Sequence, residues 1–353
     1  MTSGRRADDH LARRARRWRL VLAVLAAALL AACLLGLGSG AVTVPVGEVA
    51  RILLSRVPRW GALAGEDWPA SHEVIVVVVR APRVVLAAAV GATLGIAGAA
   101  FQGLLGNPMA DPYVIGASSG AALGATLAMT AGGILAISLV PAAFLGALAA
   151  VTAVYLLARE GGRVPQLTLL LAGVAVGSFL AAIVSGLILL SQRDVRPVIF
   201  WLMGGFSGRG WSHVLTAAPY LGLGTLVVLA MARELNALLL GEESARQLGV
   251  DTERAKLILI LGASLGTAAA VAVSGIIGFV GLVVPHLTRL WAGSDHRILL
   301  PASALAGATL LVLADLVART ALPPLELPVG VVTSLLGGPF FLFLLRRARG
   351  GLS

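Results

Sequence analysis

The chain has 353 residues, of which 58% are hydrophobic, 12% are charged and only 5% are aromatic. A soluble domain carries about 25% charged residues, so this composition excludes a soluble globular protein and a disordered chain and indicates a polytopic membrane protein. The net charge of +10 admits nucleic acid as a partner until the basic residues are placed, and the single cysteine, Cys33, excludes a disulfide framework.

Apolar runs divide the chain into candidate membrane spans. A bilayer core of about 30 Å needs roughly 20 apolar residues as helix. Charge-free runs occupy residues 20–42, 84–110, 112–158, 164–192, 210–232, 257–288, 298–314 and 327–345. The run 112–158 is long enough for two helices with a break near Gly132-Gly133 and Pro141, and the run 257–288 is expected to turn at Ser274-Gly275 and Gly278. The sequence therefore predicts an all-α polytopic membrane protein with about ten transmembrane helices.

The basic residues indicate how these helices are oriented. With the N-terminus inside, eighteen of the 27 Lys and Arg residues fall on the inner side and nine on the outer side. Because positive residues are retained in the cytoplasm, both ends of the chain are expected inside. The basic charge is then an orientation signal, and no nucleic-acid partner is expected. A cleaved signal peptide, suggested by Leu30-Ala31-Ala32-Cys33, is the competing interpretation, but the apolar run continues to about Val42, long enough to span and remain.

Two segments resemble each other at a constant offset of 171 residues. Arg83-Val84-Val85-Leu86 leads to Gly91 and Gly95, and Arg254-Ala255-Lys256-Leu257 leads to Gly262 and Gly266. Five predicted spans separate the starts, so the two copies run in opposite directions. The pattern favours an inverted internal repeat, which is common in transporters.

Residues 102–116 combine polar side chains with prolines at the inner end of the second span. Pro108 stiffens the loop, and Gln102, Asn107 and Asp111 lie close to lipid depth. Polar groups at that depth are expected to face protein or a water-filled path. A solvated inner loop is the alternative.

Residues 239–250 have the pattern of a short amphipathic helix on the inner face. Glu242 favours its N-terminal end, and Gly249 suits a C-terminal cap. Ala245 and Leu248 are three residues apart and are expected to share one face. Such a helix rests on lipid or docks into a groove on a partner, and the residues leave both open.

Three arginines lie at the predicted outer edge. Arg80 and Arg83 open the second span, and Arg319 closes the ninth. Arginine at a membrane edge commonly anchors the helix in the interface, and it is also suited to bidentate binding of a carboxylate on a partner.

Several kinds of site are not visible in the sequence. There is no G-x-x-x-x-G-K-[ST] phosphate loop, and the five histidines are scattered without ligand spacing, so we expect no catalytic residue, no cofactor and no metal site. Asp111 and Asp315 come nearest to membrane depth but lie near span ends. An ion-coupled transporter more often carries carboxylates in mid-membrane.

Taken together, these stretches resemble the FecCD/vitamin-B12-type permease family, the membrane subunits of type II ABC importers for iron–siderophores, haem and cobalamin. The resemblance covers about residues 15–347. The segments that carry it are Arg80-Ala81-Pro82-Arg83, Asn107-Pro108-Met109-Ala110-Asp111-Pro112, Leu171-Ala172-Gly173-Val174-Ala175, Trp201-Leu202-Met203-Gly204, residues 241–250, residues 275–286 and Glu326-Leu327-Pro328-Val329-Gly330.

The resemblance implies a homodimer with the pore on its two-fold axis, two ATP-binding subunits below it and a periplasmic or lipid-anchored substrate-binding protein on the outer face. It implies a multi-pass protein of the bacterial inner membrane, in contact with lipid, that catalyses no reaction itself. The implied domains are a basic cytoplasmic tail at 1–19, a transmembrane permease domain at 20–347 with a cytoplasmic coupling loop at 233–256, and a cytoplasmic tail at 348–353.

Residue roles follow from the resemblance position by position. The matched sets are binding-protein docking by Arg80, Arg83 and Arg319, an ATPase coupling helix with Gly241, Glu242, Ala245, Leu248 and Gly249, and a translocation path and inner gate with Gln102, Asn107, Pro108 and Met109. Gln166 and Leu167 are suspected near the gate. Met109 stands where Leu is more usual, and Gly106 stands where a charged residue often precedes the Asn.

The cargo stays open at this point. The breadth of the iron-chelate group favours an iron–siderophore or haem, and cobalamin is the alternative. An ion-coupled secondary transporter is a distant alternative from another class.

Overall fold

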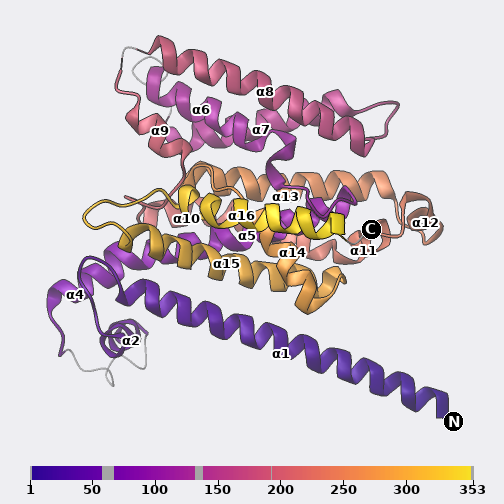
Figure 1. The fold of residues 1–353 in the computed structure, drawn as a ribbon, viewed down its shortest axis with the longest axis horizontal. Helices are drawn as coiled ribbons and strands as arrows, with labels where there is room; N and C mark the ends of the chain where they lie inside the picture. Colours follow the sequence, from indigo (N-terminus) through magenta and orange to yellow (C-terminus); the bar gives the residue numbers. More distant parts are fainter. Residues whose placement is uncertain (1, 58–66, 132–137, 192, 351–353) are drawn as a thin grey trace.

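The computed structural model describes residues 2–57, 67–131, 138–191 and 193–350, which form an all-helical membrane protein (Figure 1). The longer helices are α1 (Thr2–Gly38), α5 (Ala81–Leu104), α6 (Ala117–Ala131), α7 (Leu139–Ala158), α8 (Gln166–Leu190), α10 (Trp211–Ala230), α13 (Thr252–Ser274), α14 (Val280–Ala292), α15 (His296–Thr320) and α16 (Val329–Gly350). Shorter helices connect them: α2 (Val46–Ser55), α4 (Ala70–Val74), η1 (Ile75–Arg80), η2 (Pro112–Ile115), α9 (Arg196–Leu202), α11 (Ala232–Leu238) and α12 (Glu242–Gln247).

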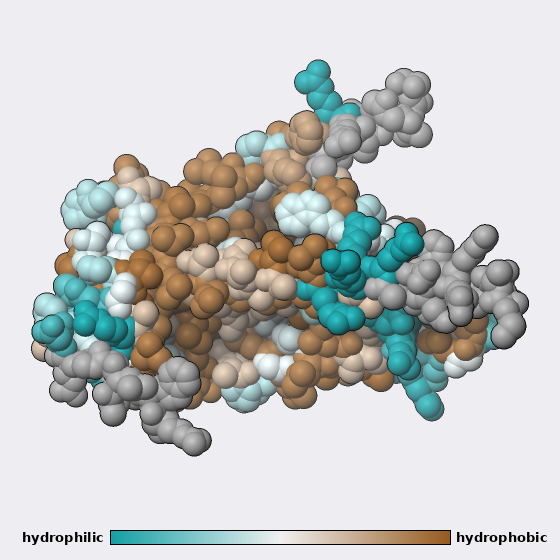
Figure 2. Space-filling model, turned by 90° about the horizontal axis from the view of Figure 1, so that it is seen from below, coloured by the Kyte–Doolittle hydropathy of each residue, from teal (hydrophilic) through white to brown (hydrophobic). Residues whose placement is uncertain are grey.

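Among the described residues, seven helical stretches are long and apolar enough to cross a membrane. They are Arg13–Gly38, Ala70–Leu104, Leu139–Ala158, Gln166–Leu190, Trp211–Ala230, Thr252–Ser274 and His296–Thr320. The long helices lie along one direction, with α2 and α4 at one end (the α4 end) and α11 and α12 at the other (the α12 end) (Figure 1). An apolar band separates hydrophilic residues at these two ends (Figure 2). This distribution is that of a protein whose middle lies in lipid.

Helix breaks fall where glycine was expected to turn the chain. The run 257–288 divides after Ser274, because Gly275 adopts a φ of +69° and leaves no room for a side chain: a Cβ there would lie 2.1 Å from the Trp201 carbonyl oxygen. The run 112–158 divides into α6 and α7, and Pro141 lies in the first turn of α7, where a missing N–H costs little. Gly132-Gly133 lies outside the described residues.

The N-terminal basic segment is not separate from the first span. The sequence places the first apolar run at 20–42, whereas α1 is one continuous helix from Thr2 to Gly38. Arg and Ala are strong helix formers, so the basic stretch extends the helix rather than ending it.

α5, α13 and α15 form the centre of the bundle. Within their apolar stretches, 78% of the α5 and α13 residues and 61% of those in α15 are buried, against 17% in α1 and α8. α5 packs directly on α15: a Cβ on Gly91 would lie 2.3 Å from the Gly307 carbonyl oxygen, so only glycine permits this approach.

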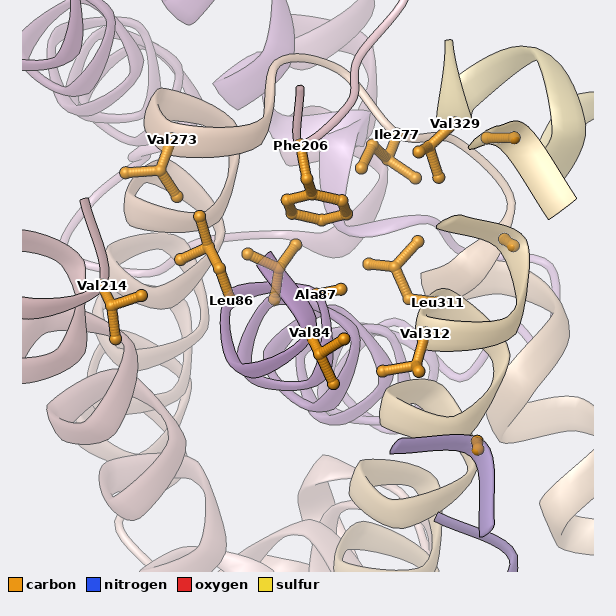
Figure 3. Packing of buried hydrophobic residues seen from close by; sticks show 14 of the residues in the cluster. Val84, Leu86, Ala87, Phe206, Val214, Val273, Ile277, Leu311, Val312 and Val329 are labelled. Atoms are coloured by element: carbon orange, nitrogen blue, oxygen red, sulfur yellow. The ribbon is translucent and has the colours of Figure 1, made fainter. Parts of the chain in front are cut away.

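Buried side chains from distant segments close the core near the α4 end (Figure 3). Phe206 is fully buried and packs among residues of α5, α10, α13, α15 and α16, including Leu86, Leu311 and Val329. This packing fixes the first turns of α5 against the last turns of α15, which carry the charged groups described next.

Candidate functional site

Charged side chains gather at the α4 end of the α5–α15 pair. Arg83 Nε donates to both carboxylate oxygens of Asp315 at 2.9 and 3.0 Å, and its Nη1 lies 2.9 Å from Glu326 Oε2. Arg319, one turn after Asp315, is 3.5 Å from the same carboxylate. Asp315 is only 1% exposed, so its charge depends on these two guanidinium groups.

The other arginine contacts go to backbone carbonyls in the last turn of α1 and directly after it. Arg80 Nη1 donates to the carbonyl oxygens of Leu37 and Gly38 at 2.8 and 3.1 Å. Arg319 Nη1 donates to the Ser39 carbonyl at 2.6 Å, and its Nη2 donates to the Gly36 carbonyl. The last carbonyls of a helix lack internal partners and carry partial negative charge, so both arginines cap α1.

All three predicted docking arginines are therefore brought together, and all three are largely buried. They are not extended anchors in the interface: Arg80 and Arg83 are 6% and 9% exposed. Three arginines face two carboxylates, so the arginine cluster (Arg80, Arg83, Asp315, Arg319 and Glu326) keeps one excess positive charge.

Two cavities give access to the arginine cluster. One of about 320 Å³ is lined by all three arginines together with Gly40 and Pro324. A second, of about 340 Å³, is lined by Arg83, Glu326, Trp201 and Arg209. Glu326 borders both, and its side chain is 40% exposed.

The opposite end carries the loop predicted as an inner gate. Asn107 and Pro108 are exposed, Met109 is half-buried, and the Asn107 side chain accepts the Met109 N–H at 2.9 Å. Gln102 lies apart from them. It is 2% exposed, donates to the Leu282 carbonyl at 3.1 Å and accepts from Arg289 at 3.2 Å, so it joins α5 to α14.

Asp111 follows this loop and begins η2. Its Oδ1 accepts the Tyr113 N–H at 2.8 Å, which caps the short helix. Burial raises the pKa of the Asp111 carboxyl to about 6, and the hydrogen bond from Tyr113 opposes that change. The carboxyl therefore keeps its proton to a higher pH than a solvated aspartate does.

The predicted amphipathic helix is α12, at the α12 end. Gly241 and Gly249 flank it with φ values of +95° and +84°, so the chain turns sharply before and after a single short helix. Glu242 pairs with Arg246 one turn later. Ala245 and Leu248 do not share a face: Ala245 is fully buried, whereas Leu248, which follows the last turn, is 66% exposed. Of these two residues, only Leu248 is available to a partner.

α12 is held by elements that are themselves fixed. α11 is tied to the start of α15, where Asn236 donates to Asp295 at 2.8 Å and accepts the His296 N–H at 2.8 Å. Hydrogen bonds from Arg297 hold the pKa of the Asp295 carboxyl well below its usual range. On the other side, Lys256 of α13 contacts Glu242 at 3.1 Å.

Gln166 and Leu167, at the start of α8, were suspected near the gate. Like the gate residues, one of them joins two helices and the other is exposed. Gln166 donates to the Leu104 carbonyl at 2.8 Å and so joins α8 to the last residue of α5. Leu167 is 68% exposed.

Sequence reasoning assigned no role to Asp315, Glu326, Lys256 or Glu253. The signal for Asp315 was its spacing of four residues before Arg319, which places the two on one helix face. Glu253 and Lys256 are likewise three residues apart on α13. Their contacts with Glu242 and Val164, and the contact of Glu326 with Arg83, join residues 14 or more positions apart, and no local pattern reveals them.

The profile of the FecCD transport family matches residues 16–347. The chain belongs to this family. FecCD proteins are permease subunits of ABC importers, so the chain is a multi-pass permease of the plasma membrane, for cobalamin, haem or iron chelates, and is not itself an enzyme. An importer of this kind works with an ATPase and a binding protein.

Three relatives and one solved structure illustrate the range of the family. The cobalamin import permease BtuC of Halobacterium salinarum is 53% identical over 279 residues, 79% of this chain and 75% of that protein. The hemin permease HmuU of Yersinia pestis is 45% identical (77% and 83% covered), and the Fe(3+) dicitrate permease FecD of Escherichia coli is 40% identical (94% and 100% covered). A metal-chelate type ABC transporter in an inward-facing conformation superposes with a TM-score of 0.81 at 31% identity, over 93% of this chain and 99% of that one.

Proposed function

We propose that this FecCD permease forms the path by which a metal chelate enters the cytoplasm, driven by a separate ATPase at the α12 end and fed by a soluble binding protein at the α4 end. The observation that carries the proposal is the position of the two candidate docking features at opposite ends of one apolar bundle (Figures 1 and 2). The arginine cluster suits acidic groups of one partner, and exposed Leu248 suits an apolar groove on another.

Ten spans with both ends inside are the topology that fits this assignment. The seven long stretches are supplemented by α6, α14 and the apolar stretch Val329–Phe343 of α16. α1 begins and α16 ends at the α12 end, which also receives most of the basic residues (Figure 1). That end is therefore the cytoplasmic one, and the α4 end is the outer one.

The inverted repeat gains support from its glycines. Gly91 of the first copy lies against the α15 backbone. In the second copy, Gly262 and Gly266 lie against Val227 and Gly224 of α10 and Thr93 of α5. Matched positions in α5 and α13 thus permit close helix crossings, as expected for two copies of one unit.

A second copy of the chain is the proposed occupant of the exposed face of α8. Leu167, Leu171, Val174 and Phe179 are each more than 60% exposed, and they follow one another at three- to five-residue spacing along the helix. Leu167 lies at the inner end of this face, beside the proposed gate. Two copies meeting along α8 would enclose a path between them, which one copy leaves open.

The relatives now favour one cargo over another. The breadth of the iron-chelate group supports an iron–siderophore or haem, whereas the 53% identity to a cobalamin permease supports cobalamin. We place cobalamin first and haem second, because the hemin permease is 45% identical.

Transport by the reconstituted complex tests the function. The permease, its ATPase and its binding protein would be placed in liposomes, and uptake of cobalamin, haem and a ferric siderophore compared with ATP, without ATP and with vanadate. ATP-dependent, vanadate-sensitive uptake of one of the three is expected. Uptake that persists without ATPase and follows an ion gradient would instead establish a secondary transporter.

Docking by the arginine cluster needs its own test. Charge reversal of Arg319 would place a new carboxylate beside buried Asp315, and reversal of Arg80 would place one against the last carbonyls of α1. Arg80→Gln and Arg319→Gln are therefore the better variants, with exposed Arg196→Gln as the control. We expect binding-protein affinity to fall at least tenfold in the first two and to be unchanged in the third. Equal affinity in all folded variants would remove the arginines from the docking site.

A further inference from the structure

One buried cation joins three separate elements at the α12 end. Lys256 lies in the second turn of α13 and is 3% exposed. Its Nζ donates to Glu242 Oε1 of α12 at 3.1 Å and to the Val164 carbonyl at 3.2 Å, and it lies 2.7 Å from Glu253 Oε1. The ammonium group therefore donates hydrogen bonds to Glu242 and Val164 and forms an ion pair with Glu253.

Further hydrogen bonds link Val164 to the segment next to the proposed gate. The Val164 N–H donates to Glu253 Oε2 at 3.1 Å, so both polar groups of this backbone unit are fixed to α13. Pro165 follows directly and restricts the backbone. The next residue, Gln166, donates to the carbonyl of Leu104, after which the chain enters the loop with Asn107.

These contacts form a continuous connection from α12 to the end of α5. It runs from Glu242 through Lys256 to Val164, then through Gln166 to Leu104. A cavity of about 590 Å³ lies beside it, lined by Leu167, Glu242 and Lys256, so side-chain packing does not join α12 to the first turn of α8 there. The polar connection is what links them.

The burial of Lys256 makes this connection stiff. Moving α12 alone would remove one partner from a charge that is only 3% exposed, and breaking a buried pair in this way is strongly unfavourable. The Arg246 contacts with Glu242 and Glu253 are half-exposed and are expected to exchange with water readily.

We propose that Lys256 is a positioning residue that makes α12 and the 163–165 turn move together, so that motion of the ATPase reaches the gate loop at the end of α5. This inference rests on the proposed function, because it assigns the route by which ATP hydrolysis drives that transport. In this role Lys256 acts through the residues it contacts, Glu242 and Val164.

The test compares Lys256→Met with Arg254→Met in the complete complex in liposomes. Met keeps the length of the side chain and removes its donors. Arg254 lies two residues earlier, is exposed and pairs with Asp251. We expect cargo taken up per ATP hydrolysed to fall at least tenfold in Lys256→Met, to be unchanged in Arg254→Met, and to recover in part in Lys256→Arg.

A distance measurement separates positioning from a merely structural role. Cys33 would be replaced by Ala, and spin labels placed at Arg163 and at exposed Gln247 of α12. With Lys256 present, their separation should be the same in the ATP-free and vanadate-trapped complexes. In Lys256→Met it should change between the two states.

Two outcomes would overturn the proposal: normal coupling in a folded Lys256→Met complex, or a label separation that changes equally with and without Lys256. If Lys256→Met does not assemble, Glu242→Gln removes the α12 end of the same connection and is measured in the same way. If the unsubstituted complex transports none of the three cargoes, the proposed function fails, and that result is distinct from either outcome above.

Discussion

The crossing of α5 and α15 should not tolerate a single added methyl group. A Cβ on Gly91 would lie 2.3 Å from the Gly307 carbonyl oxygen and 2.8 Å from Leu311 Cβ. Heavy atoms prefer separations of about 3.5 Å or more, so the two backbones would have to part by about 1 Å. Overpacking of this kind costs about 1–3 kcal/mol, and we expect Gly91→Ala to lower the unfolding temperature in detergent by about 1–4 °C.

A matched control isolates the contact from helix propensity. Gly186, near the C-terminal end of α8, has no atom within 4 Å of a built Cβ, so Gly186→Ala should leave the unfolding temperature unchanged or raise it slightly. Loss of soluble monodisperse protein on heating, followed by size-exclusion chromatography, measures both variants. If Gly91→Ala unfolds at the same temperature as Gly186→Ala, the close approach of α5 and α15 is refuted.

Three further predictions concern the two ends of the bundle. Burial raises the pKa of Asp111 to about 6, above its ordinary value near 3.9, so the folded protein keeps a proton that the unfolded chain has lost between those values. The free energy of unfolding should therefore fall by about 1–3 kcal/mol as pH rises from about 4 to about 6, and Asp111→Asn, which keeps the cap on η2, should flatten that dependence in chemical denaturation. Leu248→Asp should weaken association with the ATPase at least tenfold in co-purification, with thermal stability unchanged because the side chain is exposed, and full retention of the ATPase would exclude Leu248 from the contact. Glu326→Gln should tighten binding-protein docking by about two- to fivefold, because Arg83 loses a competing carboxylate, and weaker docking would mean that Glu326 positions Arg83 instead.

Most helix boundaries could be predicted because the residues that end a helix are visible in the sequence at the boundary itself. Gly275 ends α13, and Gly241 and Gly249 delimit α12, because each occupies backbone space that other residues rarely adopt. The continuity of α1 was missed because hydropathy reports where a helix enters lipid and carries no signal for a polar helical extension.

The sequence identified candidate site residues but not their partners, because those partners are distant in the chain. The motif placed Arg83 at a helix start, but its partner Asp315 is 232 residues away, and no local spacing encodes that pairing. Polar Gln102 was expected to face either protein or water. The structure buries it against α14, a choice that depends on packing across the bundle. Ala245 and Leu248 were expected on one face, but α12 ends before Leu248, and the turn through Gly249 carries it outward.

One helix connects the two ends of the molecule. α5 carries Arg83 in its first turn and ends at Leu104, where Gln166 binds its last carbonyl. Its 24 residues span about 36 Å, enough to cross a bilayer core of about 30 Å. Because Gly91 fixes α5 against α15, a tilt imposed at Leu104 would carry Asp315 and Arg319 with it. Docking at the arginine cluster and motion of α12 would then act on the same pair of helices from opposite ends, and by linkage each would alter the free energy of the other.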